Sequence, residues 1–199
     1  MSNEGLLLVV SGPTGAGKDK VINALLKKHN EIYTQISLTT RPKKEDDIEG
    51  VYDFVSNKEF FKKVEQGAFL EWSEVYGNYY GTPKYPVRKA LKNGKDVLLE
   101  VDIKGALQIK ETEPGAILIF ILPTSINELK ENILKSNKDT PENLLRRFNS
   151  AYNGIQLIST YNYGIINNNV EQAVEKIENI IQAEKCRVDR INFDLNKNN

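Results

Sequence analysis

The sequence predicts an α/β fold in which helices cover both faces of a parallel sheet, with a small mixed or antiparallel insert and a short lid. A continuous apolar run at residues 6–10 and apolar-rich segments at 97–101, 116–121 and 163–166 are typical of strands that are buried on both faces. Segments with apolar residues at helical spacing separate or follow these runs. Strands and helices therefore alternate along the chain, and this alternation builds a parallel sheet.

The first strand is followed by a glycine-rich loop and by a helix over residues 18–28, where apolar residues recur three and four positions apart. The same spacing predicts later helices over residues 84–93, 104–111, 126–135, 141–157 and 170–190. A polar stretch at 136–141 lies between two of these helices, and we place a lid near residues 133–143. The residues beyond about 192 are expected to fray.

Residues 38–81 have a different pattern, with dense turn signals and short apolar runs. This segment predicts strands at 52–55, 69–75 and 79–80 and one helix over 58–66. We therefore divide the chain into a core of residues 1–37 and 82–199 and an insert of residues 38–81.

Composition excludes several classes of function. The 199 residues contain 27 Lys+Arg and 27 Asp+Glu, whereas a general nucleic-acid or membrane-surface binder needs a positive excess. One cysteine, Cys186, and one histidine, His29, cannot form a disulfide framework or a Cys/His zinc site within one chain. No apolar run approaches the ~20 residues that cross a bilayer. We see no signal peptide and expect a cytoplasmic protein.

The glycine-rich loop has the pattern G-x-x-x-x-G-K between a buried strand and a helix, which is the context that a P-loop requires. Its residues are Gly12, Pro13, Thr14, Gly15, Ala16, Gly17 and Lys18. In a P-loop the backbone N–H groups and the helix N-terminus surround a phosphate, and the lysine reaches the β and γ oxygens. The alternative, a glycine-rich turn without a ligand, does not explain the lysine. The loop therefore predicts an ATP site.

Asp19 follows Lys18 at the position where the motif normally has Ser or Thr, whose hydroxyl binds Mg²⁺. A carboxylate is a good ligand for a hard cation, so Asp19 is a candidate to bind the Mg²⁺ that accompanies ATP. Alternatively, Asp19 is a first-turn residue that the helix dipole favours and that faces away. The sequence leaves both possibilities open.

Five further motifs occur in order: SLTTR at 37–41, GVYDF at 50–54, FLEW at 69–72, GNYYGT at 77–82 and LEVDIKGA at 99–106. Together with the P-loop they resemble the guanylate kinase family over residues 5–185, and GNYYGT is the most specific of them. The resemblance implies a P-loop parallel sheet with a GMP-binding insert. It also implies transfer of the γ-phosphate of Mg-ATP to GMP, and to dGMP, to give ADP and GDP.

The resemblance implies roles for individual residues. Ser37, Glu71, Thr82 and Asp102 match positions that bind the guanine edge, whose N1–H and N2–H₂ donors and O6 acceptor suit carboxylates and hydroxyls. Arg41, Lys44, Tyr52 and Tyr80 match positions that hold the GMP phosphate. Lys18, Arg41 and Arg147 match positions that stabilise the transferring phosphate, and Asn167 matches a position near adenine.

The chain departs from the family pattern around the phosphates. Lys44 stands where a second phosphate-binding arginine is usual, and Asn132 and Ser136 stand where the lid usually has two arginines. Arginine contacts to a transferring phosphoryl group can be worth about 10³–10⁵ in rate. We therefore expect a lower turnover than in a typical member, and a higher kcat when both lid arginines are restored. The loop before Tyr52 is one residue shorter than in the family pattern, so the sequence leaves open which of its residues match which family positions.

Two alternative functions come from other readings of the same residues. The fold is also used for non-catalytic modules that bind phosphorylated protein segments with a degraded P-loop, but here the glycines and Lys18 are intact. A kinase for another phosphorylated acceptor is the second alternative, and Glu71 together with Asp102 favours guanine over it. The expected partners are ATP and GMP or dGMP, with no nucleic acid and no membrane. The expected state is a monomer or a homodimer.

Overall fold

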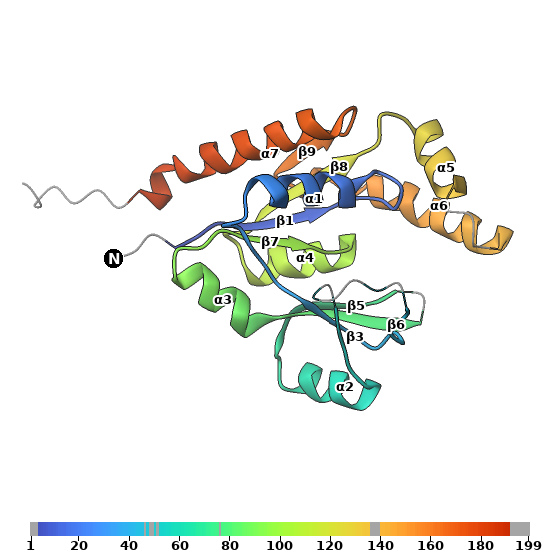
Figure 1. Cartoon of the computed structure of the whole chain (residues 1–199), viewed down its shortest axis with the longest axis horizontal. Helices are drawn as coiled ribbons and strands as arrows, with labels where there is room; N and C mark the ends of the chain where they lie inside the picture. The colour runs from blue at the N-terminus through green and yellow to red at the C-terminus, as the bar shows by residue number, and fades with distance from the viewer. Residues whose placement is uncertain are drawn as a thin grey trace, which may run out of the picture.

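The computed structural model describes residues 4–45, 47, 50, 52–75, 77–135 and 140–191. These residues form a sheet of five strands in the order β2-β7-β1-β8-β9 and a sheet of four strands in the order β4-β3-β6-β5. Figure 1 shows the larger sheet and most helices in the upper part of the molecule, with the smaller sheet and α2 below. Ser136 and the predicted fraying tail lie outside the described residues.

The larger sheet is parallel throughout, as predicted. Its strands are β1 (Leu7–Ser11), β2 (Tyr33–Thr34), β7 (Val97–Glu100), β8 (Ile117–Leu122) and β9 (Tyr163–Ile166). β1 lies at the centre, and Val9 is in register with Leu99 on one side and with Leu118 on the other. The edge strand β2 was not predicted, because two residues carry no readable periodicity.

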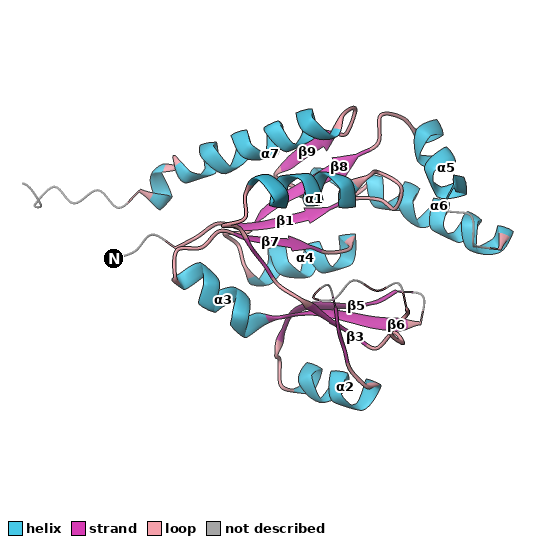
Figure 2. Cartoon of the chain, in the orientation of Figure 1, coloured by secondary structure: helices cyan, strands magenta, loops and turns pink. Residues whose placement is uncertain are grey.

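Helices cover both faces of this sheet (Figure 2). α1 (Lys18–Lys28) and α7 (Val170–Lys185) pack on one face, and α3 (Lys84–Lys92) and α4 (Ile103–Thr112) pack on the other. Because side chains alternate along a strand, Leu8 and Val10 of β1 belong to the first core, and Leu7 and Val9 belong to the second. All residues of β1 are buried, as its continuous apolar run predicted.

The smaller sheet is mixed. It contains β3 (Ser37–Thr39), β4 (Tyr52–Phe54), β5 (Phe69–Val75) and β6 (Asn78–Pro83). β3 pairs in parallel with β4, whereas β6 is antiparallel to both β3 and β5. α2 (Asn57–Glu65) covers this sheet by stacking Phe60 on Phe69, with ring centroids 4.8 Å apart. β3 was not predicted, and β6 is longer than the predicted 79–80 because it pairs along all of β5.

α5 (Ile126–Lys135) and α6 (Pro141–Ile155) pack together through a separate apolar cluster that contains Leu129, Ile133 and Ala151. α6 and α7 both end earlier than predicted, at 155 instead of 157 and at 185 instead of 190. Each is followed by a short 3₁₀ turn, Ile158–Thr160 and Val188–Arg190. Val188 is 87% exposed, so beyond Lys185 no apolar face is left to stabilise a continued helix. Among the described helices, none combines the length and the apolar character needed to cross a membrane.

Candidate active site

The P-loop connects β1 to the first turn of α1. Gly17 is the N-cap of α1 and has a φ of 73°, a conformation that glycine adopts at little cost. A Cβ at this position would lie 2.8 Å from the side-chain nitrogen of Asn167. The N-terminus of α1, with its unpaired N–H groups and positive dipole end, therefore opens directly at the loop. This arrangement is suited to binding a phosphate.

Two asparagine side chains hold the P-loop from outside. Asn132 on α5 donates from Nδ2 to the carbonyl oxygen of Gly15 at 2.9 Å, and Asn167 after β9 donates from Nδ2 to that of Ala16 at 2.9 Å. In a trans peptide the carbonyl and the following N–H point in opposite directions. Because Asn167 binds the carbonyl of Ala16, the N–H of Gly17 in the same peptide points away from Asn167. The predicted contact of Asn167 with adenine stays a prediction.

Lys18 lies beside two carboxylates. Its Nζ forms an ion pair with Oε1 of Glu100 and lies 3.4 Å from Oδ1 of Asp19. Burial opposes the charge on Lys18, but the combined attraction of Glu100 and Asp19 outweighs it and raises the pKa of the lysine. Burial raises the pKa of Glu100 in spite of Lys18. Lys18 is therefore a cation at the mouth of the P-loop.

The sequence analysis did not single out Glu100. It is the last residue of β7 and is in register with Val10 of β1, two residues before Gly12 of the P-loop. The sequence did contain a signal for Glu100, which is an acidic residue at the end of a buried strand. In parallel sheets the carboxyl ends of the strands lie along one edge, and ligands usually bind at this edge. Only the strand order shows that β7 is the neighbour of β1.

The carboxylates of Asp19 and Glu100 both lie near the Lys18 ammonium. The Asp19 carboxylate faces Lys18, which favours the ionised form, and its pKa is lowered although burial acts in the opposite direction. Nucleotide-bound Mg²⁺ takes one or two carboxylates together with phosphate oxygens and water. The two carboxylates therefore fit a Mg²⁺ ion that arrives with a nucleotide.

A second acidic site lies where the smaller sheet meets α4. Glu71 on β5 is paired in register with Thr82 on β6, and its Oε1 accepts a hydrogen bond of 2.5 Å from the Thr82 hydroxyl. Both side chains are buried. Burial, with a smaller contribution from Asp102, raises the pKa of Glu71 to about 7. Glu71 is thus poised to change its charge near neutral pH.

Asp102 caps the N-terminus of α4 and completes this site. Its Oδ1 accepts from the Gly105 backbone N–H at 2.7 Å, and its Oδ2 accepts from the Ser73 hydroxyl at 2.8 Å. A Cβ on Gly105 would lie 2.5 Å from Oε2 of Glu71, so only glycine lets this carboxylate approach the helix so closely. Glu71 on β5 and Asp102 at the N-terminus of α4 therefore lie close together, on either side of the space that a side chain at residue 105 would fill.

Ser73 was missed by the sequence analysis, although its spacing was a signal. It lies two residues after Glu71 on β5, and residues two apart on a strand share a face. Ser37, which was predicted, lies half-buried on β3, next to β6. The structure thus brings Glu71, Thr82 and Asp102 together and places Ser37 in the sheet that carries two of them.

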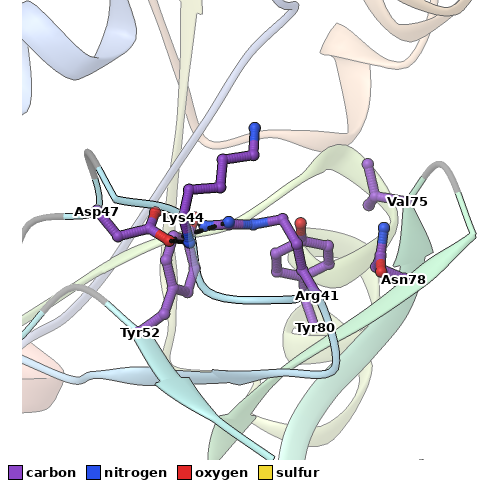
Figure 3. Close-up of a pocket in the computed structure, with 7 residues that line it drawn as sticks. All are labelled: Arg41, Lys44, Asp47, Tyr52, Val75, Asn78 and Tyr80. Carbon is purple, nitrogen blue, oxygen red and sulfur yellow. Dashed lines mark hydrogen bonds and ion pairs between the residues drawn. The ribbon is translucent and has the colours of Figure 1, made fainter.

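A cavity of about 410 Å³ opens beside this sheet (Figure 3). It is lined by Arg41, Lys44, Asp47, Tyr52, Val75, Asn78 and Tyr80. The rings of Tyr52 and Tyr80 meet edge to face with centroids 5.8 Å apart, and the Arg41 guanidinium lies 5.7 Å from the Tyr52 ring centroid. All four residues predicted to hold a phosphate therefore line one cavity, and Asp47 lines it as well.

Arg147, the remaining predicted residue, lies half-buried on α6. The apolar face of this helix packs against α5, which also carries Asn132. The predicted contact of Arg147 with a transferring phosphate stays a prediction.

Comparison with known proteins gives a consistent result. Residues 4–184 match the family model described as guanylate kinase. The chain is 51% identical over 195 residues to a guanylate kinase of Clostridium perfringens strain SM101, covering 98% of this chain and 90% of that protein. It is also 51% identical over 196 residues to a guanylate kinase of Clostridium acetobutylicum, covering 98% and 93%.

A solved structure agrees with these relatives. The crystal structure of guanylate kinase from Anaplasma phagocytophilum superposes with a TM-score of 0.78 at 30% sequence identity, covering 96% of this chain and 91% of that one. The similarity extends over both sheets and is not confined to the P-loop region.

Proposed function

The chain belongs to the guanylate kinase family and transfers a phosphoryl group from ATP to GMP. We propose that it binds the two substrates at a GMP site, which has a guanine part and a phosphate part, and at a separate ATP site. The acidic site between Glu71 and Asp102 binds guanine, the cavity around Arg41 binds the GMP phosphate, and the P-loop binds ATP. The observation that carries this assignment is the buried Glu71 carboxylate next to Asp102, because it provides acceptors for the donors of guanine.

Guanine recognition follows from the donor pattern. Ionised Glu71 has two oxygens that can accept from N1–H and N2–H₂, which adenine does not offer on the corresponding edge. Asp102 adds acceptor capacity, and the Ser37 hydroxyl can donate to O6, whereas the Thr82 hydroxyl donates to Glu71 and orients its carboxylate. We propose that dGMP is also accepted, because this recognition does not involve the sugar.

Phosphoryl transfer needs position and charge neutralisation. A GMP phosphate oxygen held by Arg41, Lys44, Tyr52 and Tyr80 attacks the γ-phosphorus in line with the leaving ADP oxygen. The P-loop N–H groups and Lys18 hold the β and γ oxygens, and Arg147 is proposed to add positive charge there. Mg²⁺, bound through Asp19 and Glu100, would supply further charge to the phosphates.

We propose the division into a core of residues 1–37 and 82–199, an insert of residues 38–81 and a lid near 133–143. It is supported by the position of the acidic site, where Glu71 from the insert faces Asp102 from the core. We also propose a cytoplasmic monomer or homodimer that binds no nucleic acid, which agrees with the balanced charge and an exposed free thiol at Cys186.

The assignment of guanine is tested by an acceptor panel. ADP release with ATP and Mg²⁺ is measured by a coupled assay with GMP, dGMP, AMP, CMP and UMP. We expect GMP and dGMP to support turnover and the other three to give less than a hundredth of it, because the acidic site leaves their edges unpaired. Comparable turnover with AMP would contradict the guanine assignment. If calorimetry showed that the protein binds GMP but does not bind ATP, a non-catalytic module would be favoured.

A second prediction concerns Asn132. Asn132→Ala removes the bond to Gly15, and a net hydrogen bond of about 1 kcal/mol corresponds to a rise of about fivefold in KM for ATP. Asn132→Arg loses the same bond but adds a cation, so we expect it to raise both KM for ATP and kcat. KM for GMP should not change in either variant. Lys130→Ala, an exposed position on the same helix, is the control, and an unchanged KM for ATP in Asn132→Ala would contradict the role.

A further inference from the structure

We propose that Asp47 is a positioning residue that holds one edge of the Arg41 guanidinium and thereby aims its other edge at the phosphate of GMP. The inference rests on the proposed role of Arg41 in binding that phosphate. Neither the P-loop nor the acidic site is involved, and Asp47 was not among the residues singled out from the sequence.

The contact between the two side chains is bidentate (Figure 3). Nη1 of Arg41 donates to Oδ2 of Asp47 at 3.0 Å, and Nη2 donates to Oδ1 at 2.7 Å. Nη1 also donates to the carbonyl oxygen of Pro42 at 2.9 Å. A guanidinium has five N–H groups in a planar fork, so these bonds take the terminal edge, while Nε–H and the second Nη2–H form the adjacent edge.

The flat faces of the guanidinium are constrained as well. Its carbon lies 5.7 Å from the centroid of the Tyr52 ring and 5.3 Å from that of Phe54. Tyr80 contributes to the raised pKa of Arg41, after Asp47, so its hydroxyl lies near the guanidinium. The adjacent edge of Arg41 is therefore fixed in a cavity that Tyr52 and Tyr80 line.

Asp47 is itself held independently of Arg41. Its Oδ2 accepts from the backbone N–H of Lys44 at 2.6 Å. The bond from Arg41, together with this backbone bond, lowers the pKa of Asp47 to about 2, so the carboxylate is ionised throughout the neutral range. The Arg41 and Asp47 side chains are only 16% and 15% exposed. A long side chain fixed in this way loses little entropy when a phosphate binds.

A competing reading is that Asp47 occupies the place of the phosphate and must be displaced by it. The geometry favours positioning, because a carboxylate on the terminal edge and a phosphate on the adjacent edge can bind one guanidinium together. The two readings predict opposite changes in the affinity for GMP when Asp47 is replaced. Loss of a positioning carboxylate weakens GMP binding, whereas loss of a competing carboxylate strengthens it.

The test compares Asp47→Asn and Asp47→Glu with Glu45→Gln, a control that removes an exposed carboxylate from the same loop. KM for GMP, KM for ATP and kcat are measured, and the Kd of GMP is measured by calorimetry. We expect Asp47→Asn to raise KM and Kd for GMP about tenfold, since the amide nitrogen cannot accept from Arg41. Asp47→Glu should recover part of this loss, and KM for ATP should not change.

A double-mutant cycle separates positioning from a general effect of charge or folding. In an Arg41→Ala background, Asp47→Asn should leave the Kd of GMP unchanged, because Asp47 acts through Arg41. A lower Kd in Asp47→Asn, an unchanged Kd, or an equal loss in the Arg41→Ala background would overturn the inference. A wild-type protein without GMP-dependent ADP release would instead refute the proposed function, so the two failures are distinguishable.

Discussion

Replacing Lys18 with methionine is expected to lower kcat about 10³-fold, because a preorganised charge at the transferring phosphate is removed. Methionine keeps the length and apolar stem of the side chain, so the P-loop glycines and the packing of α1 are retained. The change also leaves the partly buried Glu100 without its cation, and this uncompensated charge would repel the nucleotide phosphates. KM for GMP should change little, since Lys18 lies in the other site.

The measurement is steady-state ADP release at saturating GMP, with ATP varied. Lys20→Met is the matched control, because Lys20 is exposed on the first turn of the same helix and the substitution is identical. The control should retain wild-type kcat. A loss of less than tenfold in Lys18→Met, or an equal loss in Lys20→Met, would rule out the assigned role of Lys18.

Replacing Glu71 with glutamine is expected to lower kcat/KM for GMP by about 10²–10³-fold, because residue 71 then offers guanine one acceptor oxygen instead of two. The amide nitrogen would also face a donor of the base. KM for ATP should stay within twofold of wild type. Glu74→Gln, an exposed carboxylate on the same strand, is the matched control and should behave as wild type.

The same substitution is expected to stabilise the free protein at alkaline pH. Folding raises the pKa of Glu71 from 4.5 to about 7, so the folded state binds a proton more tightly than the unfolded chain. The free energy of unfolding therefore falls as pH rises between these values, by about 3 kcal/mol in total. Glutamine does not ionise, so at pH 8 the Tm of Glu71→Gln should exceed that of wild type by about 6–12 °C. The difference should vanish near pH 4, and a lower Tm at pH 8 would contradict this account.

The raised pKa of Glu71 also predicts that protons are released when GMP binds. Donors of guanine favour the ionised carboxylate, so molecules with protonated Glu71 must lose that proton when GMP binds at pH 6–7. Calorimetry in buffers of different ionisation enthalpy measures the number of protons released. Because the GMP phosphate also titrates in this range, the quantity of interest is the difference between wild type and Glu71→Gln. A zero difference would show that Glu71 does not contact guanine as an anion.

Much of the core could be predicted because its signals are local. The bounds of α1, α5, β5 and β9 agree with the predicted ranges, since apolar periodicity depends on neighbours in the sequence. The P-loop was readable for the same reason, because its glycines and Lys18 are contiguous. Strands of two or three residues, such as β2 and β3, carry no such periodicity and were missed.

The contacts that tune the sites were not readable. Glu100 reaches Lys18 over 82 residues and Asn132 reaches Gly15 over 117. Ser73 and Asp102 meet only because β5 packs against α4. The pKa of Glu71 depends on burial, and its carboxylate approaches α4 closely only because residue 105 is glycine; no motif displays either feature.

The sequence by itself determined the parallel core, the P-loop and, through short ordered motifs, the family, and it supplied most of the residues that we propose to surround each ligand. The tertiary structure alone decided how these residues are charged and held: Lys18 against Glu100, Glu71 beside Asp102, and Arg41 against Asp47. The physical reason is that a chain segment specifies its own periodicity, whereas the electrostatic environment of a side chain depends on which distant segments the sheet order brings beside it.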